Sequence, residues 1–291
     1  MIKTIEHNSP DLKNNKVAVF DFDWTLVCPY KTAIWSRNRE DWRFLYSNTK
    51  NKIEEYYENG YSIIIVTYQS KKYKLSMLQD FADTFDNIPL FIVIGDKDSK
   101  KDFDLIDYLE VHTFDSNSFY CGDADGEEGS WSDMDLLFAK RNKLTFYKPS
   151  VLFKTDVKID GNHNMIIMCG SPGSGKSTFV RDVIQPMGYT VVSSDDYKSN
   201  TKKIQKVIKD LFKKGIDKIV VDGCNPTLKN RQAYIDILED NKTYTTIYLN
   251  TPRCIAMERN NNREARVPDV AINMWFTRFE DINIDTIVDT L

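Results

Sequence analysis

Short apolar runs rich in β-branched residues recur along the chain and alternate with longer segments of helical periodicity. Such runs are typical of buried strands, and their alternation with helices indicates βαβ units and parallel sheets. The predicted strands cover residues 16–22, 61–67, 90–94, 118–121, 164–169, 190–192, 218–221 and 245–249. The predicted helices cover residues 42–59, 72–85, 103–110, 177–184, 201–214, 228–241 and 253–260.

The alternation weakens between residues 148 and 162, where Pro149 and Gly161 interrupt it before a new strand begins. A chain of 291 residues is also long enough for two domains. We therefore predict an α/β protein with two Rossmann-like domains built on parallel sheets. The first domain covers residues 1–150, a linker covers residues 151–163, and the second domain covers residues 164–291.

Composition narrows the class of protein. Hydrophobic residues make up 41% and charged residues 28%, as in soluble globular proteins. No apolar run approaches the ~20 residues of a membrane span, and the first residues lack the apolar stretch of a signal peptide. The five cysteines are scattered and no two have CxxC spacing, so we expect a reducing, intracellular compartment, cytoplasmic or nuclear.

The net charge of −4 argues against a protein that coats nucleic acid, although it allows an enzyme that grips a few phosphates. The chain is also rich in Lys, Asn, Ile and Tyr, which is typical of an AT-rich genome such as that of some viruses. Composition therefore favours an intracellular enzyme with local charge over a nucleic-acid packaging protein.

Residues 170–177, with the sequence GSPGSGKS, match the phosphate-binding pattern GxxxxGK[ST] at every fixed position. The motif lies between a predicted strand and a predicted helix, where backbone N–H groups and the helix dipole favour phosphate. Lys176 should reach the β- and γ-phosphates of ATP, and the Ser177 hydroxyl should bind Mg²⁺. The predicted ATP-binding residues are Gly170, Gly173, Gly175, Lys176, Ser177 and Thr178.

Acidic residues follow the next two predicted strands of this half. Asp195 could accept a proton from an attacking hydroxyl, as the base of a kinase does, although a helix N-cap has the same pattern. Asp222 ends its strand where it could lie near Mg²⁺ or the substrate. A later segment could close over the phosphates as a lid, or form a solvated basic helix end, and it carries Arg259, Arg263 and Arg266.

The first half carries a second acidic motif. Asp21 and Asp23 end the predicted strand 16–22, and residues two apart on a strand point to the same side. Asp21 could attack phosphorus as a nucleophile while Asp23 protonates the leaving oxygen as the general acid/base. A DxD pair alone is usually a solvated loop, so the assignment depends on residues elsewhere in the chain.

Three later positions fit the same chemistry. Thr67 ends a predicted strand and could hold a phosphate oxygen, and Lys100 or Lys101 could stabilise a phospho-aspartate. Asp123 follows the predicted strand 118–121 and suits Mg²⁺. We predict that Asp21, Asp123 and the backbone carbonyl of Asp23 bind this metal.

These residues, in order, resemble the four motifs of the haloacid dehalogenase (HAD) superfamily of phosphatases. The motifs are Asp21-Phe-Asp23-Trp-Thr25, Thr67, Lys100 and Gly122-Asp123. A HAD-like half followed by a P-loop half resembles the polynucleotide kinase 3′-phosphatases over nearly the whole chain. The resemblance implies an N-terminal HAD-like 3′-phosphatase and a C-terminal P-loop 5′-kinase that use Mg²⁺ and ATP. Their products could be sealed by a ligase, which is therefore a candidate partner.

The resemblance extends to segments that include Asp41-Trp42-Arg43, Asn225-Pro226 and Val267-Pro268. It implies that Asp195 is the kinase base, that Arg263 is the lid arginine, and that the substrate contacts are Asp222, Arg231 and Arg43. In contrast, Trp24 stands where the family usually has glycine.

The predicted substrate is a DNA or RNA end, and the sequence does not distinguish the two. Basic clusters at residues 37–43 and 71–74 could contact a nucleic-acid backbone, and Trp35, Trp42 and Trp131 could stack on bases. Solvated faces and core aromatics explain these residues equally well. Two alternatives are an enzyme for a small nucleoside or sugar phosphate and a non-catalytic scaffold that binds broken ends.

Overall fold

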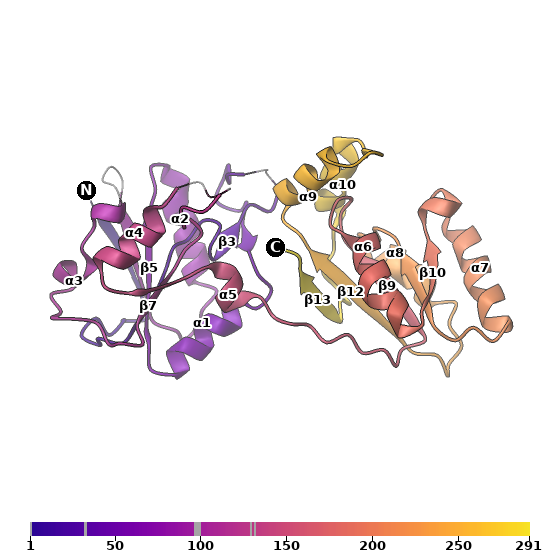
Figure 1. The fold of residues 1–291 in the computed structure, drawn as a ribbon, viewed down its shortest axis with the longest axis horizontal. Coiled ribbons are helices and arrows are strands. Elements are labelled where there is room, and N and C mark those ends of the chain that lie inside the picture. Colours follow the sequence, from indigo (N-terminus) through magenta and orange to yellow (C-terminus); the bar gives the residue numbers. More distant parts are fainter. Residues whose placement is uncertain (1, 32–33, 96–99, 129, 131) are drawn as a thin grey trace. The chain divides into compact units, whose positions relative to one another are not determined.

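The chain divides into two compact units, Met1–Lys154 and Thr155–Leu291, each with its own sheet and helices (Figure 1). This computed structural model describes residues 2–31, 34–95, 100–128, 130 and 132–291. Both units are α/β with sheets that are mainly parallel, as the alternation of apolar and amphipathic segments predicts.

The sheet of the first unit has its most buried strand, β2 (Val17–Phe20), between two parallel neighbours. The neighbours are β5 (Ser62–Tyr68) and β7 (Phe119–Cys121). Two strands extend the sheet in parallel and one closes its edge antiparallel, and these are β6 (Leu90–Gly95), β8 (Thr145–Tyr147) and β1 (Lys3–His7). The sheet order β1-β6-β5-β2-β7-β8 places the change of winding direction at β2, and ligands bind at the carboxyl end of strands at such a point.

Helices and a small two-stranded ribbon surround this sheet. The ribbon consists of β3 (Val27–Cys28) and β4 (Arg43–Phe44). The helical segments are α1 (Thr49–Glu58), α2 (Lys72–Ala82), η1 (Lys100–Asp102), α3 (Leu105–Tyr108), α4 (Met134–Arg141) and α5 (Pro149–Phe153).

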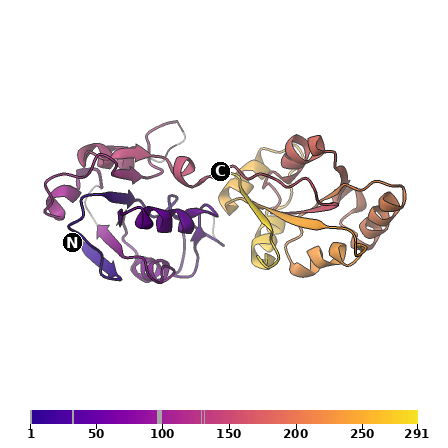
Figure 2. The same ribbon diagram turned by 90° about the horizontal axis from the view of Figure 1, so that it is seen from below.

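The sheet of the second unit is wholly parallel, in the order β10-β11-β9-β12-β13. Its strands are β9 (Met165–Cys169), β10 (Thr190–Ser193), β11 (Ile219–Asp222), β12 (Tyr244–Asn250) and β13 (Thr286–Asp289). Alternate residues of β9 serve opposite faces, since Ile167 packs with Ile204 and Ile208 whereas Ile166 packs with Val180. Both faces of this sheet are therefore covered by helices (Figure 2).

The helices of the second unit begin with α6 (Lys176–Phe179), which continues through a single π-helical turn, η2 (Val180–Ile184), and a 3₁₀ turn, η3 (Gln185–Met187). The remaining segments are η4 (Asp195–Tyr197), α7 (Thr201–Lys213), α8 (Leu228–Ile235), α9 (Arg253–Asn261) and α10 (Asp269–Arg278). Among the described residues, no helix is both long and apolar enough to cross a bilayer.

All eight predicted strands are present, but several other elements differ from the prediction. Short or edge strands were missed, as were three helices with weak periodicity, α4, α5 and α10. The helix predicted over residues 42–59 begins only at Thr49, because residues 43–44 pair as a strand. The segment predicted as a linker from residue 151 starts later, because Phe153 of α5 is fully buried against Phe20 and Tyr46.

Helix α5 offers a direct test of this corrected boundary. Phe153→Ala removes a fully buried ring and should lower the free energy of unfolding of the first unit by about 3–5 kcal/mol. Val151→Ala on the same helix is the matched control, because Val151 is 64% exposed. The free energy of unfolding of each unit is measured by urea denaturation of the full chain, together with hydrogen exchange of peptides from β2 for the first unit and from β9 for the second. Equal effects of the two substitutions would show that α5 belongs to a linker.

Candidate active sites

A buried acidic cluster lies at the carboxyl end of β2. The N–H of Asp21 donates to the carbonyl of Cys121 at 2.8 Å, which ties the end of β2 to β7. One carboxylate oxygen each of Asp21, Asp123 and Asp135 lies within 4.8 Å of the others. Oxygen-rich groups of this kind suit Mg²⁺, so these three residues form a candidate metal site. Asp135 lies in the first turn of α4, a helix that the sequence pattern did not predict, and was therefore missed.

One ammonium faces this cluster. Lys100 is 5% exposed, and its Nζ contacts Oδ1 of Asp21 and lies 2.9 Å from Oδ1 of Asp135. Lys101 is exposed, so the structure places Lys100, of the two candidates, beside the predicted nucleophile. The Tyr120 hydroxyl also donates to Oδ1 of Asp135 at 2.7 Å. Three carboxylates and one ammonium leave an excess of negative charge that a divalent cation would neutralise.

The pKa values of the cluster reflect this imbalance. Burial raises the pKa of Asp21 well above its usual value, with Lys100 opposing the shift and Asp135 adding to it. Burial, followed by the charge of Asp135, raises the pKa of Asp123 to about 7. Burial opposes ionisation of Lys100, but Asp135 and Asp21 together raise the pKa of this lysine. Shifted carboxylates at a strand-end crevice are a physical signature of a functional site.

The Asp23 side chain lies in a separate network. Its two carboxylate oxygens accept from Lys74 Nζ at 2.5 Å and from Gln69 Nε2 at 2.6 Å. Gln69 also donates to Thr67 Oγ1 at 2.9 Å, and Thr67 is buried at the end of β5. The Asp23 carboxylate is therefore not part of the acidic cluster, and metal binding by the Asp23 carbonyl stays a prediction. Thr67 and Asp23 are linked through Gln69, and neither Gln69 nor Lys74 was among the predicted site residues.

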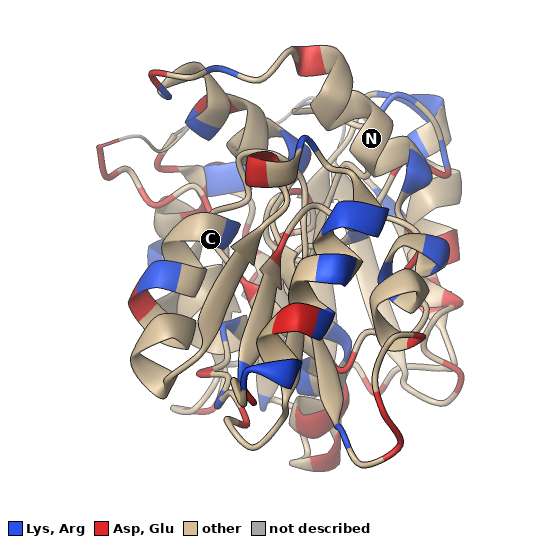
Figure 3. Ribbon diagram, turned by 90° about the vertical axis from the view of Figure 1, so that its right-hand side faces the viewer, with Lys and Arg blue, Asp and Glu red and all other residues tan. Residues whose placement is uncertain are grey.

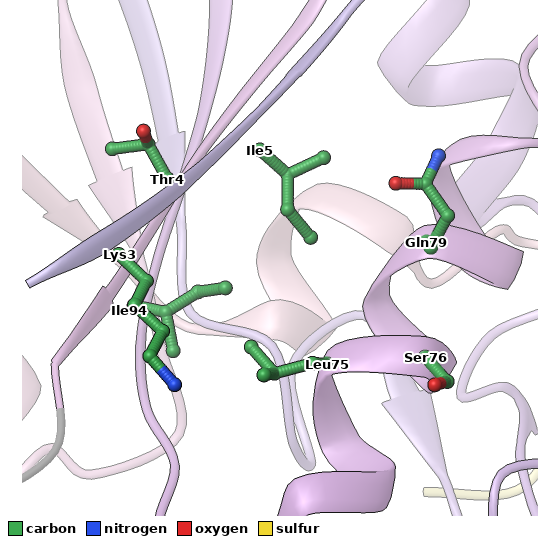
Figure 4. Close-up of a pocket in the computed structure, with 7 residues that line it drawn as sticks. All are labelled: Lys3, Thr4, Ile5, Leu75, Ser76, Gln79 and Ile94. Carbon is green, nitrogen blue, oxygen red and sulfur yellow. The ribbon is translucent and has the colours of Figure 1, made fainter.

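A cavity of about 760 Å³ opens beside Asp23. Its other walls come from residues 34–37, 68–71, 73 and 74, so it adjoins the carboxyl end of β5. A second cavity, of about 580 Å³, lies between β1 and α2 and is lined mainly by apolar and uncharged residues (Figure 4). Lys3 is the one charged side chain among the seven residues shown there, so this second cavity lacks the groups for phosphate chemistry.

The P-loop after β9 has the backbone that phosphate binding requires. Gly173 and Gly175 adopt positive φ angles of 81° and 96°. A Cβ atom on Gly173 would lie 2.1 Å from the carbonyl oxygen of Ala256, so packing against α9 also requires glycine. The Lys176 ammonium is buried and donates to the carbonyls of Gly170 and Ser171 at 2.9 and 2.8 Å. Ser177 and Thr178 are exposed on the first turn of α6, where a ligand can reach them.

The predicted kinase acids lie on the two strands beyond β9. Asp195 is exposed in η4, directly after β10, and Asp222 is half-buried at the end of β11. The Ser194 N–H donates to the Asp222 carbonyl at 2.8 Å, which joins the two strand ends. Both carboxylates thus occupy the same edge of the sheet as the P-loop, and their catalytic and substrate-binding roles stay predictions.

The three lid arginines have different surroundings. Arg259 on α9 lies 3.5 Å from the carbonyl of Ser174 in the P-loop and donates to the carbonyl of Thr290 at 2.6 Å. Arg263 is exposed beyond the end of α9, and Arg266 pairs with Asp269 at 2.9 Å. The arginine beside the P-loop is therefore Arg259, and the lid role of Arg263 stays a prediction.

The prediction that Arg231 contacts the substrate is wrong in this structure. Arg231 is fully buried, and its guanidinium donates to four backbone carbonyls at 2.6–3.1 Å. These carbonyls belong to Asn225, Pro226, Glu280 and Ile282. Arg231 therefore joins the loop after β11 to the segment before β13, and its guanidinium is buried on these carbonyls.

The other predicted nucleic-acid contacts are only partly suited to that role. Arg43 is half-buried on β4, and its substrate contact stays a prediction. Trp42 packs against Phe44 and Phe81 as a core aromatic residue. Trp35 is 56% exposed, whereas Trp131 lies outside the described residues.

Positive charge gathers instead on α7, the helix nearest the viewer in Figure 3. Six exposed lysines lie on or next to this helix, with Asp210 as the one acidic residue in the segment 201–214. They are Lys202, Lys203, Lys206, Lys209, Lys213 and Lys214. Ile204 and Ile208 are buried on the opposite side of the helix, so the lysines form a solvent-facing stripe that the sequence analysis did not single out.

Comparisons with known proteins agree with this division into two sites. Residues 16–153 match the family model described as polynucleotide kinase 3 phosphatase, and residues 165–282 match that of an AAA domain. A bifunctional polynucleotide phosphatase/kinase of Schizosaccharomyces pombe is 26% identical, over 92% of this chain and 76% of the relative. A protein of Acanthamoeba polyphaga mimivirus, provisionally named for the same two activities, is 27% identical over 96% of this chain and 84% of the relative. An uncharacterised 20.8 kDa protein of Autographa californica nuclear polyhedrosis virus is 31% identical over 50% of this chain and 90% of its own length.

The raised pKa of Asp123 predicts a specific pH dependence in metal-free protein. The folded state retains a proton up to about pH 7, whereas an unperturbed aspartate loses it near 3.8. The free energy of unfolding should therefore fall as the pH rises from about 4 to about 7, with Asp123 contributing up to about 4 kcal/mol of the fall and Asp21 adding to it. Mg²⁺ should raise the thermal midpoint more at pH 8 than at pH 5.

Thermal denaturation across this pH range, with and without Mg²⁺, measures the effect. Asp123→Asn should reduce the pH dependence, with the contribution of Asp21 remaining, and should remove most of the Mg²⁺ stabilisation. Asp86→Asn is the control, because Asp86 is exposed and is not part of the acidic cluster. Mg²⁺ stabilisation that is unchanged in Asp123→Asn would exclude the cluster as the metal site.

Proposed function

Because this chain belongs to the polynucleotide kinase 3′-phosphatase family, we propose that it heals nucleic-acid ends with two separate active sites. The N-terminal unit removes 3′-phosphates, and the C-terminal unit phosphorylates 5′-hydroxyls with ATP. The observation that carries the proposal is the cluster of buried Asp21 and Asp135 with half-buried Asp123, in a chain that also holds a complete P-loop. The names of two relatives that match more than 90% of this chain support the nucleic-acid substrate.

In the phosphatase, Asp21 attacks the terminal phosphorus, so that a bond from Oδ to phosphorus forms while the bond from phosphorus to O3′ breaks. Asp23 enters this step protonated, with the hydrogen bond from Lys74 or Gln69 to one of its oxygens released, and it gives that proton to O3′. It afterwards takes a proton from the water that releases phosphate. Thr67 and Gln69 position Asp23 and the phosphate, and Lys100 stabilises the charge on the reacting groups. Mg²⁺, held by Asp21, Asp123 and Asp135, would neutralise the phosphate oxygens.

In the kinase, the P-loop backbone and Lys176 hold the phosphates of ATP, and Ser177 would bind its Mg²⁺. Asp195 accepts the proton of the 5′-hydroxyl, whose oxygen forms a bond to the γ-phosphorus as the bond to ADP breaks. Arg259, beside Ser174, and Arg263 stabilise the developing charge. Asp222 orients the acceptor or the metal at the adjacent strand end.

The partners in this proposal are DNA or RNA ends and ATP, with a ligase as the enzyme that seals the healed ends. An intracellular site of action, cytoplasmic or nuclear, is part of the same proposal because ATP and nucleic-acid ends occur there. The viral relatives allow a viral source.

The two sites can be tested with one substrate, a nicked duplex with 3′-phosphate and 5′-hydroxyl ends, in the presence of Mg²⁺ and ATP. Asp21→Asn should reduce phosphate removal at least about a thousandfold and leave phosphorylation intact, because it removes the nucleophile. Lys176→Ala should reduce phosphorylation about a hundredfold and leave phosphate removal intact. If neither end is converted while a small phosphate ester is hydrolysed, the substrate is a metabolite and the proposal is wrong.

The α7 lysines provide a second test of the nucleic-acid substrate. Replacing Lys206, Lys209 and Lys213 by Gln should raise the KM of the kinase for an oligonucleotide about tenfold at low salt, with the KM for ATP unchanged. The difference in this KM between the variant and the wild type should disappear at high salt, because the lysines act by neutralising phosphates.

The matched control replaces three exposed lysines of the first unit by Gln, namely Lys3, Lys13 and Lys154. It therefore has the same net charge as the α7 variant. An equal rise in KM in this control would show that net charge, and not α7, governs substrate binding.

A further inference from the structure

We infer that the cavity beside Asp23 binds the terminal nucleoside of the 3′-phosphorylated strand, with the base of that nucleoside stacked on Trp35. The inference rests on the proposed phosphatase function and identifies the part of the substrate that this site recognises.

The position of Asp23 determines what can occupy the cavity. As the general acid, Asp23 must lie within hydrogen-bond distance of the O3′ atom that leaves. The sugar that carries O3′ must then lie next to Asp23, and the base on that sugar extends away from the acidic cluster. Asp23 itself lines the cavity of about 760 Å³, which is within the range of pockets that hold small organic ligands. A base connected to that sugar therefore has space in this cavity.

The lining of the cavity has the chemistry of a nucleotide subsite. Three aromatic residues, Trp35, Tyr68 and Tyr73, contribute to its walls. Arg37 and Lys71 add positive charge, and Asp23 is the one acid among the lining residues that the structure describes. Trp35 is 56% exposed, so its large apolar surface is open to a planar ligand. Aromatic stacking with nearby cations is how proteins hold single-stranded nucleic acid without strong base preference.

Hydrogen bonds fix the backbone on either side of Trp35. The Trp24 indole donates to the carbonyl of Ile34 at 3.0 Å, and the Tyr73 hydroxyl donates to the carbonyl of Ser36. Trp24 makes its bond with a φ of +62°, a conformation that is unfavourable for a bulky residue. Such strain persists where the surrounding structure requires it, often at functional sites. Trp24 therefore positions the segment 34–36, and with it Trp35, beside Asp23.

The experiment compares kcat/KM for three phosphatase substrates. The substrates are a 3′-phosphorylated single-stranded oligodeoxynucleotide, the same strand with an abasic 3′-terminal residue, and p-nitrophenyl phosphate. The variants are Trp35→Ala, Trp35→Phe and Trp24→Gly. Tyr57→Ala is the control, because Tyr57 is also an exposed aromatic residue but lies near the end of α1, which leads to the amino end of β5.

Trp35→Ala should lower the ratio of kcat/KM for the oligonucleotide to that for p-nitrophenyl phosphate by about 10- to 100-fold, mainly through KM. Trp35→Phe should recover most of this loss, and Trp24→Gly should lower the ratio although it relieves the backbone strain. The abasic strand should show little difference between wild type and Trp35→Ala. Tyr57→Ala should leave every ratio unchanged.

If wild type converts the oligonucleotide and Trp35→Ala leaves the ratio unchanged, the nucleoside subsite is wrong while the proposed function stands. An equal loss on all three substrates would make Trp35 a structural residue and would also overturn the inference. If wild type converts only p-nitrophenyl phosphate, the proposed function fails and the subsite fails with it.

Discussion

The unequal balance of three carboxylates and one ammonium at the end of β2 is the constraint on which the N-terminal unit depends. One carboxylate oxygen each of Asp21, Asp123 and Asp135 lies within 4.8 Å of the others, and Lys100 pairs with Asp21 and Asp135, so full ionisation of the three carboxyls would leave a net negative charge. Such an arrangement is unfavourable for folding, and the fully apolar strand β2 and its buried neighbours must offset it. The benefit is a site already shaped to accept a divalent cation and a phosphate.

The second unit binds a negatively charged group instead, although it too uses the carboxyl edge of a mainly parallel sheet, with a different strand order. In both sheets the reactive groups follow the strand at which the winding direction changes, β2 in one unit and β9 in the other. At β9 the concentrated charge is positive, because Lys176 is buried on the carbonyls of its own loop and Arg259 lies beside Ser174. The first unit therefore suits phosphate binding through a bound cation, and the second unit suits direct phosphate binding by the P-loop.

The strands and the motif residues could be predicted because both depend on local sequence. Fully buried strands such as β2 and β9 are apolar runs, and the chemistry of an α/β sheet lies at the strand ends. Asp135 was missed because it approaches the cluster only through the packing of α4, a helix with weak periodicity. Lys74, likewise, could not be assigned to Asp23 from a separation of 51 residues. Arg231 was assigned to the substrate wrongly, because its place in a motif does not show whether its guanidinium faces a ligand or, as here, backbone carbonyls.

The central claim is that Asp21 is the phosphatase nucleophile, and chemical trapping of the intermediate tests it most directly. Acid quenching during turnover of a 3′-phosphorylated oligonucleotide, followed by borohydride reduction and peptide mass spectrometry, converts an aspartyl phosphate into homoserine at the position where it formed. Conversion should occur at residue 21 alone, and none should occur in the absence of substrate or Mg²⁺. Conversion at residue 23 or residue 123, or active turnover with no conversion at any aspartate, would contradict the claim.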